Sequence, residues 1–419
     1  MSAIKWFVGI DWGPSVHAVC VLDANGRVCE QRQVDHDATA LQGFVDALLT
    51  RADGQASTVA IAIEMPRGAL VELLVERGFV VYAINPKQLD RFRDRFTVAG
   101  AKDDRRDALV LADSLRTDPS AFRRVRLDDP VVIQLREWSR VDEELQVELV
   151  RLTNRLRDLV YRVTPGLLTL CPGADEAWLW TLLAGAPTPA DQQRLSLRRL
   201  DRVLRQHRIR RLTAVDVRAV LQQPVVFTAP GVAEAVAAHC RLILPRIDLV
   251  AGQRRECERT LERLLDELAE QDPGVGDQRE HSDVAILRSL PGVGNRVAAR
   301  MLAEASQPLT DRAYHMLRAR MGIAPVTKQS GRRRTVSMRY ACDRRLRQAA
   351  YHWARVGMQR DIGSRAYYAA LRARGHSHGR ALRSVADRLL RLLFALLKHR
   401  QLFDPAYTRR VAALEEATT

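Results

Sequence analysis

Four carboxylates stand at positions where acidic side chains could do chemistry. Asp11 interrupts the apolar run at 7–12, and Glu64 directly follows the apolar run at 59–63. Asp104 and Asp107 are three residues apart in a segment with helical spacing, which places both on one face of a helix. Because an ionised carboxylate in a buried strand is costly unless it is paired or binds a cation, Asp11 in particular predicts a ligand.

Clusters of oxygen ligands alone are typical of Mg²⁺ or Mn²⁺ sites. If the strands that carry Asp11 and Glu64 are neighbours, the helix with Asp104 and Asp107 can complete such a site. Two ions held in this way activate a nucleophile and stabilise a leaving oxygen in phosphodiester transfer. The alternatives are solvated acids at the start of a helix for Asp104 and Asp107, and a pairing with Arg67 for Glu64.

The last third of the chain has two features suited to phosphate. Ser330 and Gly331 precede three consecutive arginines, so the serine hydroxyl could meet a phosphate that those arginines hold; a polar turn is the alternative. Leu290-Pro-Gly-Val-Gly294 lies between two helical segments, the pattern of a helix-hairpin-helix. Gly292 and Gly294 permit a tight turn before the free N–H groups of the second helix, although an ordinary helix–helix turn would have the same residues.

The charge of the chain is strongly segregated. It has 66 lysines and arginines against 50 acidic residues, for a net charge of +16. Residues 1–120 have a net charge of −3, residues 121–284 are neutral, and residues 285–419 have a net charge of +19. This pattern indicates a C-terminal domain that binds a polyanion, with nucleic acid as the first candidate.

Cysteine and hydropathy patterns exclude several protein classes. The six cysteines include no CxxC pair, so they predict neither a zinc site nor a disulfide framework, and they favour a reducing, cytoplasmic location. No apolar run reaches the roughly 20 residues that a membrane span requires, so we expect no membrane partner.

The sequence predicts three domains. In residues 1–120, three strands at about 5–11, 18–22 and 28–34 precede alternating strands and helices, which predicts a mixed α/β sheet. In residues 121–284, heptad runs at 145–163 and 243–268 predict an antiparallel or intermolecular coiled-coil arm, or two bundle helices. Residues 285–410 should form a helical domain, whereas residues 166–236 suggest no chemistry.

These motifs together resemble the RuvC-like DEDD transposases of insertion sequence family 110, which are relatives of the pilin-gene DNA invertases. The resemblance rests on Gly-Ile-Asp at 9–11, Ile-Glu at 63–64, Lys-x-Asp-x-x-Asp-Ala at 102–108, Leu-Pro-Gly-Val-Gly at 290–294, Gly-Ile-Ala-Pro at 322–325, Gln-Ser-Gly at 329–331 and Arg-Arg-Leu-Arg at 344–347. It implies an RNase H-like catalytic domain, a coiled-coil linker and a helical C-terminal domain with a catalytic serine.

The resemblance also implies roles for single residues. Asp11, Glu64, Asp104 and Asp107 would bind Mg²⁺ or Mn²⁺, with Asp103 as an alternative to Asp104, and Ser330 would form a covalent link to DNA. The expected nucleic-acid contacts are Lys102, Gly292, Gly294, Lys328, Arg332, Arg333, Arg334, Arg344, Arg345 and Arg347.

We therefore expect a metal-dependent DNA recombinase in a prokaryotic cytoplasm, bound to the nucleoid when it acts. Its expected partners are donor and target double-stranded DNA, a structured guide RNA from the element, and further copies of the chain in a dimer or tetramer. One alternative is a RuvC-like nuclease that uses metal-activated water, with Ser330 structural. The other is a nucleic-acid-binding protein without activity.

Overall fold

The computed structural model describes residues 3–64, 66, 68–84, 86–93, 103–126, 128–224, 226–272, 281–331 and 333–405. The chain divides into two compact units, Met1–Asp128 and Asp129–Thr419. The first unit extends beyond the predicted boundary at residue 120 because a short strand, Arg123–Arg124, joins its sheet. The predicted boundary at 284/285 does not separate compact units, since helices on both sides of it share one core.

The predicted mixed sheet of the N-terminal unit is present, and it has six strands. Its strand order is β3-β2-β1-β4-β5-β6. The strands β1, β2 and β3 are antiparallel neighbours, β4 and β5 continue from β1 in parallel, and β6 is antiparallel to β5. Their bounds are Trp6–Asp11, Val16–Asp23, Val28–Asp35, Val59–Ile63, Val80–Ala83 and Arg123–Arg124.

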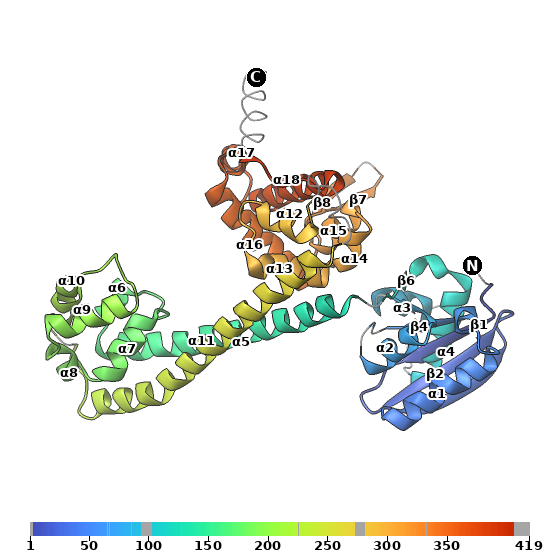
Figure 1. Cartoon of the computed structure of the whole chain (residues 1–419), viewed down its shortest axis with the longest axis horizontal. Coiled ribbons are helices and arrows are strands. Elements are labelled where there is room, and N and C mark those ends of the chain that lie inside the picture. Colours follow the sequence, from blue (N-terminus) through green and yellow to red (C-terminus); the bar gives the residue numbers. More distant parts are fainter. Residues whose placement is uncertain are drawn as a thin grey trace, which may run out of the picture. The chain divides into compact units, whose positions relative to one another are not determined.

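Helices cover both faces of this sheet (Figure 1). Val8 and Ile10 of β1 pack towards α1 (Ala38–Arg51) and α2 (Ala69–Glu76) in one core. On the other face, α3 (Pro86–Arg93) and α4 (Asp104–Thr117) pack against alternate strand residues such as Ala60 and Ala62. Two short 3₁₀ helices, Ala56–Thr58 and Pro119–Ala121, complete the unit.

Two long helices form the frame of the C-terminal unit (Figure 1). α5 (Pro130–Val163) and α11 (Val232–Glu270) run antiparallel along each other. The C-terminal half of α5 packs against the N-terminal half of α11, as in the contact of Leu156 with the cluster around Ile247. The predicted arm is therefore an antiparallel pair within one chain. With 39 residues, α11 alone spans about 58 Å at 1.5 Å per residue.

Helices pack at both ends of this antiparallel pair. Around the end where α5 stops and α11 begins, a small module encloses Trp178, Trp180 and Leu200. Its helices are α6 (Leu167–Leu170), α7 (Ala177–Gly185), α8 (Pro189–Gln193), α9 (Leu197–Gln206) and α10 (Ala214–Leu221). We call it the arm-tip module.

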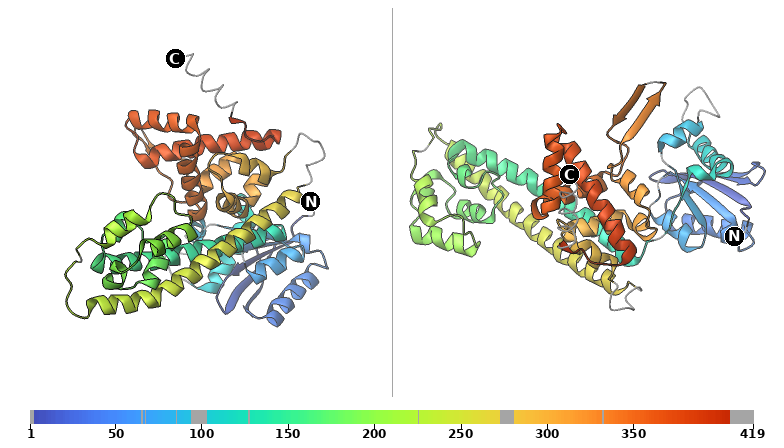
Figure 2. Two further views of the ribbon diagram at one scale, coloured as in Figure 1. Left: turned by 60° about the vertical axis from the view of Figure 1, so that its left-hand side comes forward. Right: turned by 90° about the horizontal axis from the view of Figure 1, so that it is seen from above.

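The other end of the pair supports the C-terminal module. Its helices are α12 (Asp283–Ser289), α13 (Asn295–Glu304), α14 (Ser306–Thr310), α15 (Tyr314–Arg320), α16 (Arg344–Arg360), α17 (Ile362–Ala373) and α18 (His378–His399). The strands β7 (Val326–Ser330) and β8 (Arg333–Ser337) form a hairpin that stands away from these helices (Figure 2). None of the described helices combines the length and apolar composition needed to cross a membrane.

Candidate active site and nucleic-acid surface

Asp11 and Glu64 lie at the same edge of the N-terminal sheet. Asp11 is the last residue of β1, and Glu64 directly follows β4. The two strands are parallel neighbours, with Ile10 of β1 opposite Ile63 of β4. The next residue of each strand is therefore an acid, and both side chains are only partly buried. The expected adjacency of their strands is confirmed.

The third element of this edge, α4, lies directly on β1. A Cβ atom at Gly9 would be 1.9 Å from the carbonyl oxygen of Ala108 and 2.6 Å from the backbone nitrogen of Ala112. Glycine is thus required for this close approach. Because α4 begins at Asp104, its first turn brings Asp104 and Asp107 to the edge at which β1 ends.

The charges at this edge act on one another. Burial raises the pKa of the Asp11 carboxyl group, and the negative charges of Asp107, Asp104 and Glu64 raise it further, to about 6. The positive charge of Arg93 opposes this rise. Four acids from two strands and one helix therefore share an electrostatic environment in which a bound cation would be stabilised.

Arg93 holds one of these acids in place. Its Nε and Nη2 atoms donate to the two carboxylate oxygens of Asp107, both at 2.7 Å. Asp107 is 6% exposed, so this bidentate pair provides the counter-charge that a buried carboxylate needs. Arg93 was not predicted from the sequence. The last turn of α3 contains both Arg91 and Arg93, and the sequence does not indicate which of the two side chains contacts Asp107.

The donor set fits a hard divalent cation. All four side chains offer oxygen, the ligand that Mg²⁺ and Mn²⁺ prefer, and their mutual repulsion favours an added positive charge. Among the described residues, no three His, Cys, Asp or Glu side chains are gathered closely enough to hold an ion already.

The structure favours Asp104 over Asp103 as the partner of this group. Asp103 is the N-cap of α4, and its carboxylate accepts a hydrogen bond from the Arg105 backbone nitrogen at 3.2 Å. Asp104 contributes to the raised pKa of Asp11, whereas Asp103 is not among the charges that do so. Lys102, Arg332 and Arg67 lie outside the described residues.

Ser330 lies at the turn of the β7–β8 hairpin, opposite Arg333 in the strand register. Its neighbours Lys328, Arg333 and Arg334 are all exposed, and Gly331 has a positive φ of 54° at the turn. In the described part of the chain the Ser330 hydroxyl has no hydrogen-bond partner. The serine and three cations are thus accessible to a ligand on one ribbon.

The glycine turn at 291–294 has two different environments. The Pro291 carbonyl oxygen accepts a hydrogen bond from Trp353 Nε1 at 3.2 Å. A Cβ atom at Gly292 would lie 2.4 Å from the Gly357 backbone nitrogen, so Gly292 serves the packing of the turn on α16. Gly294, the N-cap of α13, has open space around it and is the glycine that a phosphate could reach.

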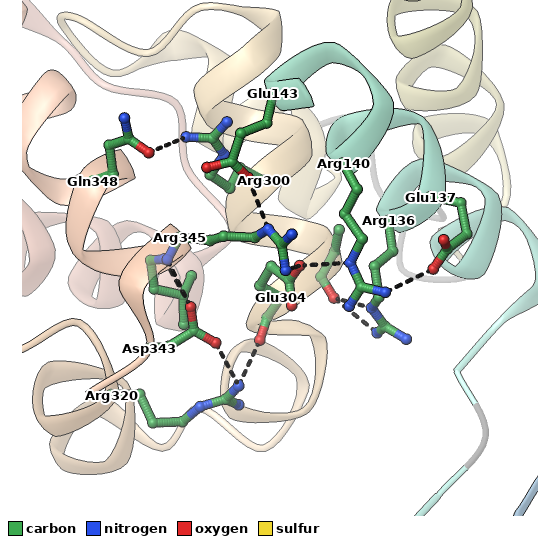
Figure 3. A network of polar contacts seen from close by, with 12 residues as sticks. Arg136, Glu137, Arg140, Glu143, Arg300, Glu304, Arg320, Asp343, Arg345 and Gln348 are labelled. Atoms are coloured by element: carbon green, nitrogen blue, oxygen red, sulfur yellow. Dashed lines mark hydrogen bonds and ion pairs between the residues drawn. The ribbon is translucent and has the colours of Figure 1, made fainter. Parts of the chain in front are cut away.

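The arginines at the start of α16 differ in their availability. Arg344 is exposed, whereas Arg345 Nε pairs with Glu143 of α5 at 2.7 Å (Figure 3). Arg345 also approaches Glu304, the carboxylate that joins α5, α13 and α16 in this network. Arg347 Nη2 donates to the carbonyl oxygens of Arg339 and Tyr340, at 3.0 and 2.9 Å. Arg347 thus supports the segment after the hairpin, whereas Arg345 joins α16 to α5 and α13.

Two family models match the chain. Residues 8–165 match the model of the DEDD transposases of IS110, described as a transposase, and residues 284–369 match the model described as the transposase IS116/IS110/IS902 family. The first match contains all four acids and the second contains Ser330. Residues 166–283, with the arm-tip module, lie outside both matches.

Relatives with known names agree with these matches. A protein of Sinorhizobium fredii that is named as a transposase, y4uE, is 46% identical over 50% of this chain and 58% of its own length. The mini-circle transposase for IS117 of Streptomyces coelicolor is 29% identical over 96% of both chains. The 42 kDa protein of insertion element IS900 from Mycobacterium paratuberculosis is 27% identical over 98% of this chain and 100% of its own.

Proposed function

The chain belongs to the IS110 family of transposases, and on this premise we propose that it cuts and rejoins DNA with Ser330 as the nucleophile and divalent metal at Asp11, Glu64, Asp104 and Asp107. The proposal assigns the two kinds of chemistry to the two units of the chain. The acids belong to the N-terminal unit and the serine to the C-terminal unit. Neither unit alone would complete the reaction.

The raised pKa of Asp11 is the observation that carries the metal part of the proposal. Like charges that raise the pKa of a partly buried carboxyl group oppose folding, so their placement at one sheet edge points to a binding role rather than to stability. When bound, Mg²⁺ or Mn²⁺ would lower the pKa of a coordinated hydroxyl and stabilise the negative charge on a leaving oxygen. Arg93 would keep Asp107 oriented before the ion arrives.

The exposed hairpin supports the serine part of the proposal. Ser330 Oγ would attack phosphorus, the bond from phosphorus to the 3′ oxygen would break, and DNA would remain linked to serine through its 5′ phosphate. The Ser330 proton leaves to solvent or base, and the 3′ oxygen gains one. Lys328 and Arg333 lie on the same face of the ribbon as Ser330 and would hold the non-bridging phosphate oxygens during this step.

The partners follow from the same premise. We propose donor and target duplex DNA as substrates, a structured RNA from the element as guide, and a homo-oligomer of two or four chains in the prokaryotic cytoplasm. The net charge of +19 on residues 285–419 supports a polyanionic partner for the C-terminal module. Guidance by RNA predicts that strand exchange requires the RNA transcribed beside the gene.

The test is a strand-exchange assay with the full chain, Mg²⁺, the flanking RNA and labelled donor and target DNA. We expect joined products that EDTA abolishes, and a loss of at least about 100-fold in Asp11→Asn and Ser330→Ala. Asp113→Asn on α4 and Ser337→Ala on β8 are the controls, since each changes the same residue type at a position away from the proposed site.

The controls should retain activity within about threefold. Free cut ends that persist in Ser330→Ala would instead support the nuclease that uses water. Binding of DNA without any cleavage, unchanged by EDTA, would support the inactive binding protein.

A further inference from the structure

We propose that the arm-tip module is a second nucleic-acid-binding surface, which holds the phosphate backbone of duplex DNA through Arg198, Arg202, Arg208 and Arg210. None of the residues assigned to the proposed reaction lies in this module. The module also lies outside both family models.

Residues 121–284 are neutral in total, but they consist of two parts with net charges of opposite sign. Residues 194–211 contain eight arginines and one aspartate, whereas the rest of this stretch has 17 basic and 24 acidic residues. The basic segment comprises α9 and the loops on either side of it, at the end of the antiparallel pair (Figures 1 and 2). The arm is thus acidic along its length and basic at its tip.

All eight arginines are exposed, and four of them lie close to partners within the protein. Arg205 pairs with Asp201 at 2.9 Å, and Arg211 pairs with Glu176. Arg194 lies close enough to Asp191 to lower the pKa of that carboxyl group, after the larger effect of the Thr188 hydrogen bonds. Arg199 reaches Gly185 at the C-terminal end of α7, where a cation stabilises the last carbonyls.

The remaining four, Arg198, Arg202, Arg208 and Arg210, are exposed. Within the part of the chain that the structure describes, none of these guanidinium groups forms an ion pair or a side-chain hydrogen bond. Arg198 and Arg202 are one turn apart on the same side of α9, about 6 Å along its axis. Arg208 and Arg210 continue from the end of that helix.

The backbone at Arg208 is left-handed, and this ending of α9 directs the chain that carries Arg208 and Arg210. Arg208 has a φ of 55° just after α9, a left-handed position at which glycine is the usual residue. The turn is closed by hydrogen bonds from the Arg208 nitrogen to Arg205 and from the Ile209 nitrogen to Leu204. An arginine in this conformation is strained, and its guanidinium group has no partner in the protein that offsets the strain.

The chemistry of the surface favours duplex DNA. Four unpaired guanidinium groups match the bidentate geometry of phosphate oxygens. The segment 194–211 has no Phe, Tyr or Trp, so it offers no platform on which unpaired bases could stack, as single-stranded RNA usually requires. Trp178 and Trp180 of the module are buried in its core. Duplex backbone is therefore the occupant that fits.

The test compares two quadruple variants of the full chain, each with four substitutions. The measurements are made in EDTA, so that no reaction takes place. One variant replaces Arg198, Arg202, Arg208 and Arg210 with Gln, and the matched control replaces Arg194, Arg199, Arg205 and Arg211 with Gln. Both remove four charges from the same segment. Binding to a labelled duplex of about 40 base pairs is measured by fluorescence anisotropy over a range of salt concentrations.

We expect the first variant to lose at least about tenfold in affinity near 0.15 M salt. The slope of log K plotted against log salt concentration should also become shallower by about 3. The control should stay within about threefold. Equal losses in both variants, or none in either, would overturn the proposal. A loss confined to a structured RNA competitor, with duplex binding intact, would overturn it in favour of an RNA surface.

Arg208→Gly adds a readout that a merely structural role would not give. We expect the unfolding temperature to rise by about 2–4 °C as strain is relieved, while affinity for duplex DNA falls. A rise in both stability and affinity would contradict the proposal. Because the binding assay is carried out in EDTA and scores no adduct at Ser330, failure of this inference and failure of the proposed reaction are distinguishable.

Discussion

At Gly9 the approach of α4 to β1 leaves no space for a side chain. We expect Gly9→Ala to lower the free energy of unfolding by about 2–4 kcal/mol, because α4 must move away from β1 and with it Asp104 and Asp107. Gly43→Ala is the matched control. Gly43 lies in the exposed interior of α1 with nothing within 4 Å, so alanine should stabilise that helix by about 0.5–1 kcal/mol. Urea unfolding of both variants measures the difference.

Asp11 opposes folding when no cation is bound, because burial and three like charges disfavour its ionised form. We therefore expect Asp11→Asn to raise the unfolding temperature in EDTA by about 2–4 °C. Mg²⁺ should raise the unfolding temperature of the wild type by a similar amount, but not that of Asp11→Asn. Differential scanning fluorimetry with and without Mg²⁺ checks both statements. An equal Mg²⁺ effect in the two proteins would contradict the metal assignment.

Asp387 of α18 is a buried carboxylate whose charge is fully partnered. Burial alone would raise its pKa, but hydrogen bonds from Arg318 at 2.7 Å and Tyr314 at 2.8 Å, with the charge of Arg391, leave the pKa below its ordinary value. A lowered folded-state pKa gives stability that is present above about pH 4 and is lost as pH falls below it. Asp387→Asn should therefore cost about 2–4 kcal/mol at pH 7, and this difference should shrink below pH 4. A difference that stays constant down to pH 3 would contradict this account.

At the scale of elements, the sequence predicted those whose residues repeat with a clear period. The apolar runs that lead to Asp11 and Glu64 are confirmed as neighbouring buried strands. Strand β6 was missed because it has two exposed arginines and no apolar pattern, and pairs with β5 only through the tertiary fold. The predicted heptad run at 243–268 lies within α11, which continues through Pro245 from Val232 to Glu270.

Contacts that depend on side-chain direction were beyond the sequence. The pairing of Arg93 with Asp107 joins two helices, and the packing of Gly292 on α16 depends on where that helix lies. Neither contact produces a periodic pattern in the sequence from which it could be predicted. The sequence therefore predicted the acids of the candidate site, but not the cation that holds one of them.

The α5–α11 pair tests the prediction made at this scale. Leu156 is fully buried between the two helices, whereas Leu242 on the outer side of α11 is 72% exposed. Leu156→Ala should cost about 2–5 kcal/mol in the free energy of unfolding, and Leu242→Ala less than about 0.5 kcal/mol, when both are measured by urea unfolding of the full chain. Equal costs would show that the outer stripe is also covered, as in an intermolecular coiled coil.

For the whole molecule, charge and chemistry are divided in a consistent way. The N-terminal unit is slightly acidic and holds the carboxylates, while the basic residues gather in the C-terminal module and at the arm tip. Such a division favours metal in one unit and phosphate backbone in the other. The two family models that match the chain are both described as transposases, one over the four acids and the other over Ser330.

The covalent link to serine is the central claim, and one measurement tests it most directly. The full chain is incubated with Mg²⁺, flanking RNA and radiolabelled DNA, separated on a denaturing gel, and the labelled band is digested for mass spectrometry. The account predicts a protein–DNA adduct on the peptide that contains Ser330, absent in EDTA and in Ser330→Ala, and present in Ser337→Ala. Cleaved DNA with no adduct, or an adduct on another residue, would contradict the account.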